Sequence, residues 1–349
     1  MGSGFSEMNL FLCHTPLHLL ISMMVAYRKN DPQNTIFVVV EDSRGLHSLA
    51  VQLLRDGMGR LVMLPGSATA EGRLQRTLIM RSNARFLCRE FGQVVRSVYL
   101  FHDLRPEPQS LLNMKRFKKI SADFIMLEDG IALYRPGGVI PWSLLGVLKH
   151  KFAAGPHWMK FDELGLHPSI SRICCFYPDL LRENLRPLPV DTLPKDRVFI
   201  EDVRLQMPLE FYGKKITLIA VPYADSVSSK FMRNFLDPIV EYCRKNETSP
   251  IFKIHPRDKN GAEILTDFWG DPLFMPQHLP AEMILFSGLN IHSIIGSRTS
   301  TLHIAKFLFP EICVFHYDEM LDEDGRVWIE FLDHVGVSLI YNHSELLPA

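Results

Sequence analysis

The sequence lacks an excess of charge of either sign, because its 38 lysines and arginines are balanced by 39 aspartates and glutamates. A protein that neutralises a nucleic-acid backbone is expected to carry a basic excess, so DNA or RNA binding is not predicted. The sequence also lacks any apolar stretch of about 18 residues, the length that a membrane-spanning helix needs. These absences favour a protein that is soluble or peripheral to a membrane.

Motifs of several common enzyme classes are also missing. The six cysteines are scattered, and no pair has the two-residue spacing of zinc or redox motifs, so reduced cytosolic thiols are expected. Neither HExxH nor a His/Cys cluster with ligand spacing occurs, so no metal cofactor is predicted. The absence of GxGxxG, GxxxxGK[ST] and GxSxG argues against an NAD site, a P-loop and an α/β-hydrolase.

The N-terminus shows no targeting signal. Its first ten residues lack the cationic start and apolar run of a signal peptide, so no leader is expected and Met8 is expected to be the native start.

What the sequence contains is enough apolar material for more than one core. Hydrophobic residues make up 47% of the 349 residues, and a length of about 100 to 200 residues per domain predicts two domains. Short apolar strands are predicted at 8–13, 35–42, 60–66, 97–103 and 123–130, and helical patterns separate them. Strands that are apolar on both faces and alternate with helices predict a doubly wound parallel sheet.

A second alternation of strands and helices begins at residue 214. Strands are predicted at 214–223, 250–256, 290–296 and 312–317, with helices at 231–246, 279–288 and 300–309. Prolines punctuate residues 136–194, which we interpret as the inter-domain region. We therefore predict an N-terminal domain over 1–190 and a C-terminal domain over 191–349, with functional loops at the carboxyl ends of the strands of each.

Two adjacent carboxylates close the predicted strand 123–130. Glu128 and Asp129 point to opposite sides of an extended chain, so only one of them is expected to face a cleft, and Gly130 permits a sharp turn after them. A general base would be placed well at this position, and a solvated turn is the alternative.

Two segments of the second half suggest anion binding. His255 lies before Pro256 at a strand end, flanked by Lys253 and Arg257; the alternative is a surface loop that contains a histidine by chance. The segment from Gly296 to Thr301 opens a helix, where hydroxyls, free amides and the helix dipole favour a phosphate, although Ser300 and Thr301 also suit a plain helix cap.

A basic cluster lies on the predicted helix before strand 123–130. It consists of Lys115, Arg116, Lys118 and Lys119, and either a solvated face or contact with an anionic membrane or polyanion would explain it.

The order of these motifs resembles that of the bacterial sialyltransferases, both the lipooligosaccharide sialyltransferases and the capsule polysialyltransferases. The resemblance lies in CHTPLHLLIS (13–22), LEDG (127–130), KIHPRD (253–258), LPAE (279–282) and the pair Ser300-Thr301. It implies an α/β fold of the GT-B type, with two Rossmann-like domains facing across a cleft. It also implies transfer from a CMP-activated sialic acid without a metal or other cofactor.

The resemblance also implies roles for individual residues. Glu128 would be the general base, His255 would contact or protonate the departing phosphate, Ser300 and Thr301 would bind that phosphate, and Glu282 would accept hydrogen bonds from the cytidine ribose. Pro256, Lys253 and Gly296 would complete the donor site, and Asp129, Gly130, Thr15 and Arg257 would support it. Arg298 and Thr299 are expected to crowd the hydroxyl pair.

The sequence therefore predicts an inverting, metal-independent glycosyltransferase that moves sialic acid from CMP-sialic acid to an oligosaccharide or glycolipid acceptor. The acceptor would belong to a bacterial lipooligosaccharide or capsule. The expected location is cytoplasmic, with peripheral contact at the inner membrane. The chain is short for a polysialyltransferase, which favours transfer of a single sugar and leaves polymer elongation open. A transferase for Kdo, pseudaminic acid or another nucleotide sugar, or a non-catalytic nucleotide- or glycan-binding protein, is the alternative.

Overall fold

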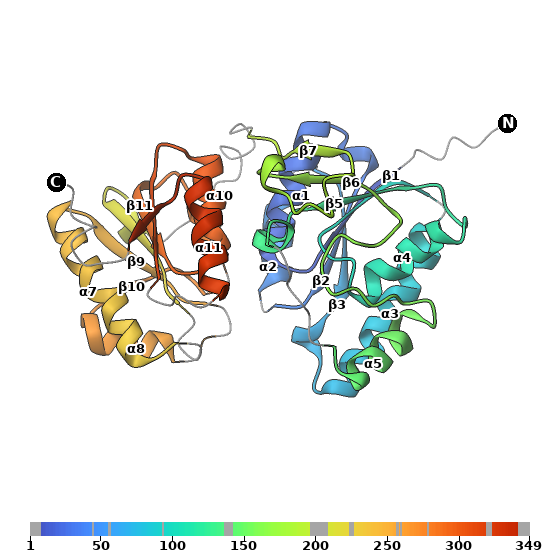
Figure 1. The fold of residues 1–349 in the computed structure, drawn as a ribbon, viewed down its shortest axis with the longest axis horizontal. Coiled ribbons are helices and arrows are strands. Elements are labelled where there is room, and N and C mark those ends of the chain that lie inside the picture. The colour runs from blue at the N-terminus through green and yellow to red at the C-terminus, as the bar shows by residue number, and fades with distance from the viewer. Residues whose placement is uncertain are drawn as a thin grey trace. The chain divides into compact units, whose positions relative to one another are not determined.

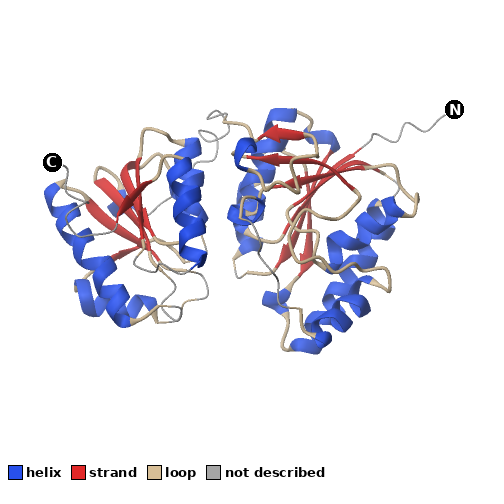
Figure 2. Cartoon of the chain, in the orientation of Figure 1, coloured by secondary structure: helices blue, strands red, loops and turns tan. Residues whose placement is uncertain are grey.

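The chain folds as two compact units, residues 1–196 and 197–349. The computed structural model describes residues 8–43, 45–54, 57–92, 94–135, 142–195, 209–222, 227–255, 258, 260–277, 279–318 and 323–340. Each unit is an α/β domain built on one parallel sheet, as the strand and helix patterns predict (Figures 1 and 2). In the described residues, no helix combines the length and apolar character needed to cross a membrane.

The first unit contains a seven-stranded sheet in the order β3-β2-β1-β4-β5-β6-β7, in which all pairs are parallel. Its strands are β1 (Met8–Cys13), β2 (Thr35–Glu41), β3 (Arg60–Pro65), β4 (Val95–Leu100), β5 (Asp123–Leu127), β6 (Ile170–Cys175) and β7 (Val190–Thr192). Phe11 of β1 stacks between Phe37 of β2 and Tyr99 of β4, with ring centroids 5.4 and 4.3 Å away. The central strands are buried on both faces, which requires helices on both sides of the sheet.

The helices of the first unit cover the two faces of its sheet (Figure 1). They are α1 (Pro16–Lys29), α2 (Leu46–Leu53), α3 (Arg73–Phe91), α4 (Pro106–Arg116) and α5 (Leu144–Ala154). The pair α1 and α2 lies on one face, and α3, α4 and α5 pack together on the other. Short 3-10 turns occur at Pro32–Asn34, Ser67–Thr69, Gly130–Leu133 and Pro178–Leu180.

The prediction that residues 136–194 form an inter-domain region is wrong. This segment supplies α5, β6 and β7 to the first unit, and β7 pairs with β6 in its sheet. The prolines that interrupt its pattern, such as Pro156, Pro168 and Pro178, lie outside these elements or at the start of a 3-10 turn. A domain boundary between residues 190 and 191 would divide β7, whereas the first unit extends to residue 196.

The second unit has a six-stranded sheet in the order β10-β9-β8-β11-β12-β13, again with parallel pairs. Its strands are β8 (Lys215–Ala220), β9 (Ser249–Lys253), β10 (Leu273–Phe274), β11 (Asn290–Gly296), β12 (Cys313–Tyr317) and β13 (Ser338–Ile340). Its helices are α7 (Ser229–Lys245), α8 (Gly261–Trp269), α9 (Ala281–Ile284), α10 (Ser300–Leu308) and α11 (Glu323–His334), and a 3-10 turn spans Leu209–Phe211. The helix predicted at 279–288 is only the single turn α9.

Both sheets reverse their winding direction next to their first strand. In the first unit β1 lies between β2 and β4, and in the second unit β8 lies between β9 and β11. Ligands of doubly wound folds bind at such a switch point, outside the carboxyl ends of the strands. Residues that follow β1, β4, β8 and β11 are therefore the first candidates for function.

Candidate functional site

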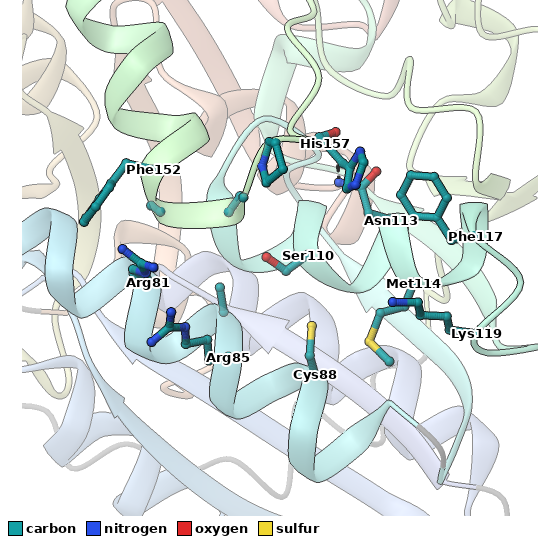
Figure 3. Close-up of a pocket in the computed structure, with 15 residues that line it drawn as sticks. Arg81, Arg85, Cys88, Ser110, Asn113, Met114, Phe117, Lys119, Phe152 and His157 are labelled. Carbon is teal, nitrogen blue, oxygen red and sulfur yellow. Dashed lines mark hydrogen bonds between the residues drawn. The ribbon is translucent and has the colours of Figure 1, made fainter.

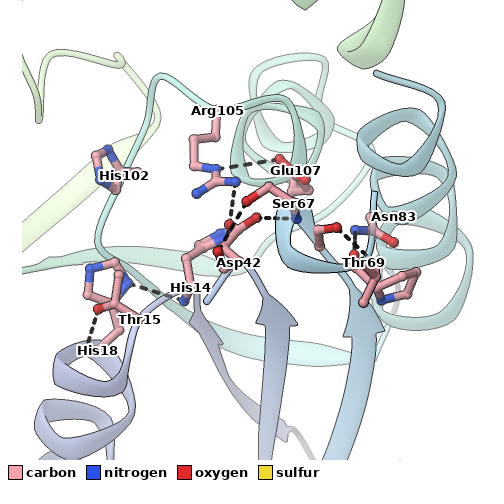
Figure 4. Close-up of polar contacts among 12 residues, drawn as sticks. His14, Thr15, His18, Asp42, Ser67, Thr69, Asn83, His102, Arg105 and Glu107 are labelled. Atoms are coloured by element: carbon pink, nitrogen blue, oxygen red, sulfur yellow. Dashed lines mark hydrogen bonds and ion pairs between the residues drawn. The ribbon is translucent and has the colours of Figure 1, made fainter. Parts of the chain in front are cut away.

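Polar side chains follow five neighbouring strands of the first unit at their carboxyl ends, and Figure 4 shows those that follow β1, β2, β3 and β4. Because all these strands are parallel, their carboxyl ends share one edge of the sheet. The residues at this edge are His14 and Thr15 after β1, Asp42 after β2, Ser67 after β3, His102 and Arg105 after β4, and Asp129 after β5. They form two hydrogen-bonded clusters, one around Asp129 and one around Asp42.

The structure places the side chain of Glu128 in the interior and that of Asp129 at the surface. Glu128 is fully buried, and its Oε2 accepts hydrogen bonds from the hydroxyl of Tyr134 and, at 2.7 Å, from the backbone N–H of Phe176. The side chain of Asp129 points the other way and keeps 22% of its surface exposed. The prediction that only one carboxylate faces outward is correct, and that carboxylate is Asp129, whereas Glu128, the predicted general base, faces the interior. Gly130 makes the expected sharp turn, with φ of 59°.

Asp129 is held between two imidazoles. Its Oδ1 lies 2.9 Å from Nε2 of His18, and its Oδ2 lies 2.6 Å from Nε2 of His102. Burial by itself would raise the pKa of Asp129, but the nearby imidazoles of His102 and His18 and their hydrogen bonds hold this pKa well below its ordinary value. Asp129 therefore remains an ionised, oriented carboxylate over the whole physiological pH range.

The tautomer of His18 follows from its contacts. The backbone N–H of His14 donates to Nδ1 of His18 at 3.2 Å, so the proton of the neutral ring lies on Nε2 and is donated to Asp129. The ring is fully buried and stacks on Phe101 at 4.0 Å, and burial lowers its pKa. Thr15 supports this geometry as the cap of α1, because its Oγ1 accepts from the N–H of His18 at 3.2 Å.

The same tautomer bears on metal binding. Among the described residues, His18, His102 and Asp129 form a group whose ligand atoms all lie within 4.8 Å of one another, a spacing that a cation would permit. A histidine ligand must present a lone pair, but Nε2 of His18 carries a proton because Nδ1 accepts from an amide. This donor set fits a hydrogen-bonded carboxylate better than a metal.

The second cluster centres on Asp42. Its Oδ2 lies 3.1 Å from Nδ1 of His14 and 2.5 Å from Nη2 of Arg105, and its Oδ1 accepts from the N–H of Ser67 at 2.8 Å. Burial by itself would raise the pKa of Asp42, but the hydrogen bond with His14 and the charge of Arg105 hold this pKa below its ordinary value. Nε2 of His14 and Nδ1 of His102 are both buried, and neither has a hydrogen-bond partner in the part of the chain that the structure describes. Each of these two nitrogens is the acceptor of its ring, because the other nitrogen of the ring faces a carboxylate.

We expect His14 to make the protein less stable in mild acid. Burial, and after it the charge of Arg105, lowers the pKa of His14 to about 3, although Asp42 opposes this shift. Below about pH 6.5 the unfolded chain binds a proton at this residue and the folded chain does not, so stability falls as the pH falls. The expected loss from this group between pH 7 and pH 5 is about 2 kcal/mol, since each pH unit below the unfolded pKa contributes about 1.4 kcal/mol.

Urea unfolding at pH 7 and pH 5 measures this effect. His14→Gln should reduce the difference between the two pH values, whereas the same replacement at His47, which is exposed on α2, should leave it unchanged. An unchanged pH dependence in His14→Gln would show that His14 binds a proton as readily in the folded protein as in the unfolded chain, which contradicts the prediction.

In the second unit, three predicted residues lie close together in the interior. Thr301 Oγ1 donates to Oε1 of Glu282 at 2.9 Å, and both side chains are buried. Lys253 is buried as well, and its Nζ donates to the carbonyls of Ile254 and Gln277 at 2.7 and 3.0 Å. Burial lowers the pKa of Lys253 to about 8 and raises the pKa of Glu282. Lys253 thus holds the loop that follows β9.

The start of α10 separates the predicted phosphate ligands. Thr299, not Ser300, caps the helix, and the hydroxyl of Thr301 is occupied by Glu282 and Thr299, so the prediction that Ser300 and Thr301 share one phosphate is not supported. Ser300 is half-buried at the first helical position. Of the two residues expected to crowd the pair, Thr299 contacts it, with its hydroxyl 3.2 Å from that of Thr301, and the guanidinium of Arg298 binds Asp318 at 2.7 Å.

Gly296 allows the last residue of β11 to pass close to β8. A Cβ atom at this position would lie 2.9 Å from Cγ2 of Thr299 and 3.1 Å from Cβ of Ala220. The glycine therefore lets the loop before α10 fold against the carboxyl ends of both strands.

His255 is exposed at the end of the segment that follows β9. Its carbonyl accepts from the N–H of Asp258 and from Nε2 of Gln277, both at 2.9 Å, which fixes the backbone of this turn. Asp258 in turn caps the start of α8 by accepting from the N–H of Gly261 at 2.8 Å. Pro256 and Arg257 lie outside the described residues, so their predicted roles stay predictions.

Sequence reasoning missed most of the carboxyl-edge residues of the first unit, namely His14, His18, Asp42, His102 and Arg105. A signal for them was present. Each of the segments HTP, ED and FHD comes directly after an apolar strand, as LEDG does. If the polar residues after every predicted strand are treated as LEDG is, the crevice rule for parallel sheets predicts that they share one site.

Comparison with known proteins identifies a family and a fold. Residues 69–318, more than half of the chain, match the family model for alpha-2,8-polysialyltransferase (POLYST). No curated protein sequence matches the chain.

Similar solved structures include two sialyltransferases and an epimerase. The alpha/beta-galactoside alpha-2,3-sialyltransferase of Photobacterium phosphoreum has a TM-score of 0.58 at 12% identity, over 95% of this chain and 98% of that one. The 2,6-sialyltransferase of Photobacterium sp. JT-ISH-224, solved with CMP and lactose, has a TM-score of 0.54 at 9% identity, over 95% and 78%. The UDP-GlcNAc 2-epimerase of Neisseria meningitidis has a TM-score of 0.60 at 12% identity, over 97% and 89%. These likenesses concern the fold, and they confirm the predicted GT-B class of two Rossmann-like domains.

Proposed function

Because the chain belongs to the alpha-2,8-polysialyltransferase family and is therefore a sialyltransferase, we propose that it transfers sialic acid from CMP-sialic acid to the terminal sugar of an oligosaccharide. The observation that carries the mechanism is Asp129, an ionised and partly exposed carboxylate held between two histidines that follow β1 and β4, the strands of the switch point. The complex of the Photobacterium sp. 2,6-sialyltransferase with CMP and lactose supports the classes of donor and acceptor.

In the proposed reaction, an acceptor hydroxyl attacks the anomeric carbon of the sialyl group. The bond from this carbon to the phosphate oxygen breaks, CMP leaves with the electron pair, and attack from the opposite face inverts the anomeric configuration. The departing phosphate leaves an oxocarbenium-like centre, so the attacking hydroxyl becomes strongly acidic as its new bond forms. A carboxylate with a low pKa is then a sufficient proton acceptor, and Asp129, oriented by His102 and His18, takes this role.

Acceptor binding is assigned to the same edge. Nε2 of His14 and Nδ1 of His102 are buried nitrogens that lack a partner among the described residues, and sugar hydroxyls would donate to them. Arg105, already fixed by Asp42, adds positive charge beside them. An anionic acceptor, such as a sugar chain that already ends in sialic acid, suits this charge.

Donor binding is assigned to the second unit. His255 is the exposed group that would contact and protonate the departing phosphate, and Ser300 and the first amides of α10 would bind its oxygens. Glu282 would accept from the ribose through the oxygen that Thr301 leaves free.

The donor assignment makes a prediction at Ser300. Ser300→Ala should weaken CMP binding by about 1 to 3 kcal/mol, the range for a hydrogen bond to a charged group, and should leave cytidine binding almost unchanged. Titration calorimetry with both ligands checks this. Thr301→Val is the comparison, because loss of its bond to the buried Glu282 should affect both ligands and the stability of the unit. Equal losses for CMP and cytidine in Ser300→Ala would remove Ser300 from the phosphate site.

Metal independence is part of the proposal. Since the protonated Nε2 of His18 argues against a cation between His18, His102 and Asp129, we expect initial rates to be the same with and without EDTA. Rates measured after EDTA treatment, and again after addition of Mg²⁺, Mn²⁺ or Zn²⁺, provide the check. Loss of activity that one of these ions restores would contradict it.

One assay separates the proposed function from its rivals. CMP-sialic acid, CMP-Kdo and CMP-pseudaminic acid are each supplied with a neutral and a sialylated oligosaccharide, and CMP release and products are measured. Acceptor-dependent CMP release with CMP-sialic acid alone is the expected result. A preference for another donor names the rival transferase, and binding without CMP release under any condition identifies a non-catalytic protein.

The proposed setting is the cytoplasmic face of a bacterial inner membrane, where lipooligosaccharide or capsule glycans receive sialic acid. The product lengths obtained with a sialylated acceptor decide between a single transfer and polymer elongation.

A further inference from the structure

Helix α5 presents its apolar side chains to solvent. Leu144 and Leu145 are 76% and 78% exposed, and Leu148 and Phe152 are about half exposed, whereas Ala153 is the buried residue of this helix. Large apolar side chains that cluster on one exposed surface mark an interaction site more often than isolated ones do. We therefore expect another molecule to bind this surface.

The apolar surface continues onto α3, which packs against α5. Leu74 is 74% exposed and Leu78 is about half exposed. The guanidinium of Arg81 on α3 lies over the ring of Phe152 at 4.4 Å, which joins the two helices at the position shown in Figure 3. We call the exposed residues of these two helices the α3–α5 surface.

The charged residues of the α3–α5 surface are almost all cationic. The two helices carry five arginines, two lysines and one glutamate, and this glutamate, Glu90, lies at the far end of α3. Burial, and after it the charges of Arg76, Arg105 and Arg73, lowers the pKa of Lys149. A solvated helix would mix both signs of charge, so this composition indicates an anionic partner.

The α3–α5 surface borders the edge of the sheet that carries Asp129. Helix α3 follows β3 and the Ser67–Thr69 turn, so it begins at the carboxyl edge of the sheet. The Ser67–Thr69 turn that precedes α3 binds Asp42 through the backbone N–H of Ser67 at 2.8 Å, and Asp42 also binds Arg105 at that edge. A partner on the surface would therefore lie next to the proposed acceptor site.

We propose that the α3–α5 surface binds an anionic lipid membrane, with its leucines inserted at the interface and its arginines and lysines paired with lipid phosphates. Exposed leucines are stabilised by transfer into an apolar phase, which a membrane provides and a polyanionic glycan does not. The arginines and lysines of the α3–α5 surface complement an anionic layer of lipid headgroups. The proposal deepens the membrane setting given above. It would deliver a lipid-linked acceptor beside Asp129.

Vesicle sedimentation with the full chain tests this proposal. Vesicles of phosphatidylcholine alone are compared with vesicles that contain about 30% phosphatidylglycerol, an anionic fraction at which each surface cation still contributes. We expect binding to the anionic vesicles only, weakening as salt is raised. The variant Leu144→Gln/Leu145→Gln/Leu148→Gln should bind at least tenfold more weakly, and Arg73→Gln/Arg76→Gln should lose the preference for anionic lipid.

Matched controls keep the result interpretable. Val240→Gln/Ile264→Gln replaces exposed apolar residues of the second unit and should bind vesicles as wild type does. All variants should retain the wild-type rate of sialic acid transfer to a short, soluble acceptor. This rate tests the proposed function, whereas vesicle sedimentation tests membrane binding, so the two proposals can fail separately. The single change Leu148→Gln serves if the triple variant does not fold.

Two outcomes would overturn the proposal. One is wild-type binding to anionic vesicles by the leucine variants, or no binding by the wild type. The other is displacement from vesicles by soluble oligosialic acid together with unchanged binding in the leucine variants, which would assign the surface to an anionic glycan.

Discussion

Asp129→Asn is expected to lower kcat by about 10²-fold or more while leaving CMP affinity near the wild-type value, because a positioned base contributes about 10² to 10⁴ to the rate. The amide retains the shape of the side chain but cannot accept the proton of the acceptor hydroxyl. Initial rates with CMP-sialic acid and a sialylated acceptor, together with calorimetric CMP binding, measure the two quantities. The variant should fold, since the carboxamide oxygen still accepts a hydrogen bond from His18 or His102.

Glu128→Gln is the matched control, because it makes the same chemical change on the neighbouring residue. Its side chain is buried and accepts from Tyr134 and Phe176, so an amide that adds two donors there should destabilise the fold by about 1 to 3 kcal/mol. The folded protein should keep most of its kcat. A loss of kcat in Glu128→Gln with unchanged urea stability, beside a near-wild-type rate in Asp129→Asn, would restore the base that the sequence motif suggests.

The second large effect is expected at His255. His255→Ala should reduce kcat by about 10²-fold, because the departing phosphate loses its proton donor, and it should also weaken CMP binding while cytidine binds as before. A pH–rate profile should show that the variant lacks the loss of activity on the alkaline side that deprotonation of a general acid produces. Rates, calorimetry and this profile together separate a chemical role from a structural one.

A change in the loop that follows β10 serves as the control for His255. Gln277→Leu removes the amide that donates to the carbonyls of His255 and Asp258, so the imidazole remains but its backbone support is lost. We expect Gln277→Leu to lose less kcat than His255→Ala and to leave the alkaline side of the pH–rate profile unchanged. Equal effects of His255→Ala on CMP and cytidine binding, with no change in the alkaline limb, would mean that His255 only shapes the loop.

Local pattern was sufficient to predict the framework of the fold. Continuous apolar strands such as β2 and β8 can be satisfied only in a sheet that is covered on both faces, and the helices between them require parallel order. The hydrophobic pattern did not predict elements that are short or only partly buried. β7 has three residues and is half exposed, and α5 points its leucines outward, so neither carries the periodicity of a buried element.

The chemistry of the site depended on contacts that no local pattern contains. An extended chain sends Glu128 and Asp129 to opposite sides, but contacts with Tyr134 and with Phe176, which is 48 positions from Glu128, decide which side is the interior. The end of β4 behaves in the same way, because Asp103 is buried and accepts from the N–H groups of Gly165 and His167, which leaves His102 to face Asp129.

By itself, then, the sequence determined which strand ends carry polar groups, since alternation along a strand and the direction of a parallel sheet are properties of the local chain. Only the tertiary structure decided which of those groups meet. The bond between His18 and Asp129 joins residues 111 positions apart, and the bond between Thr301 and Glu282 closes a buried pair whose members each resemble a surface ligand in the sequence. Burial, tautomer and pKa arise from such distant contacts, because they depend on what excludes water from a group and what donates to it.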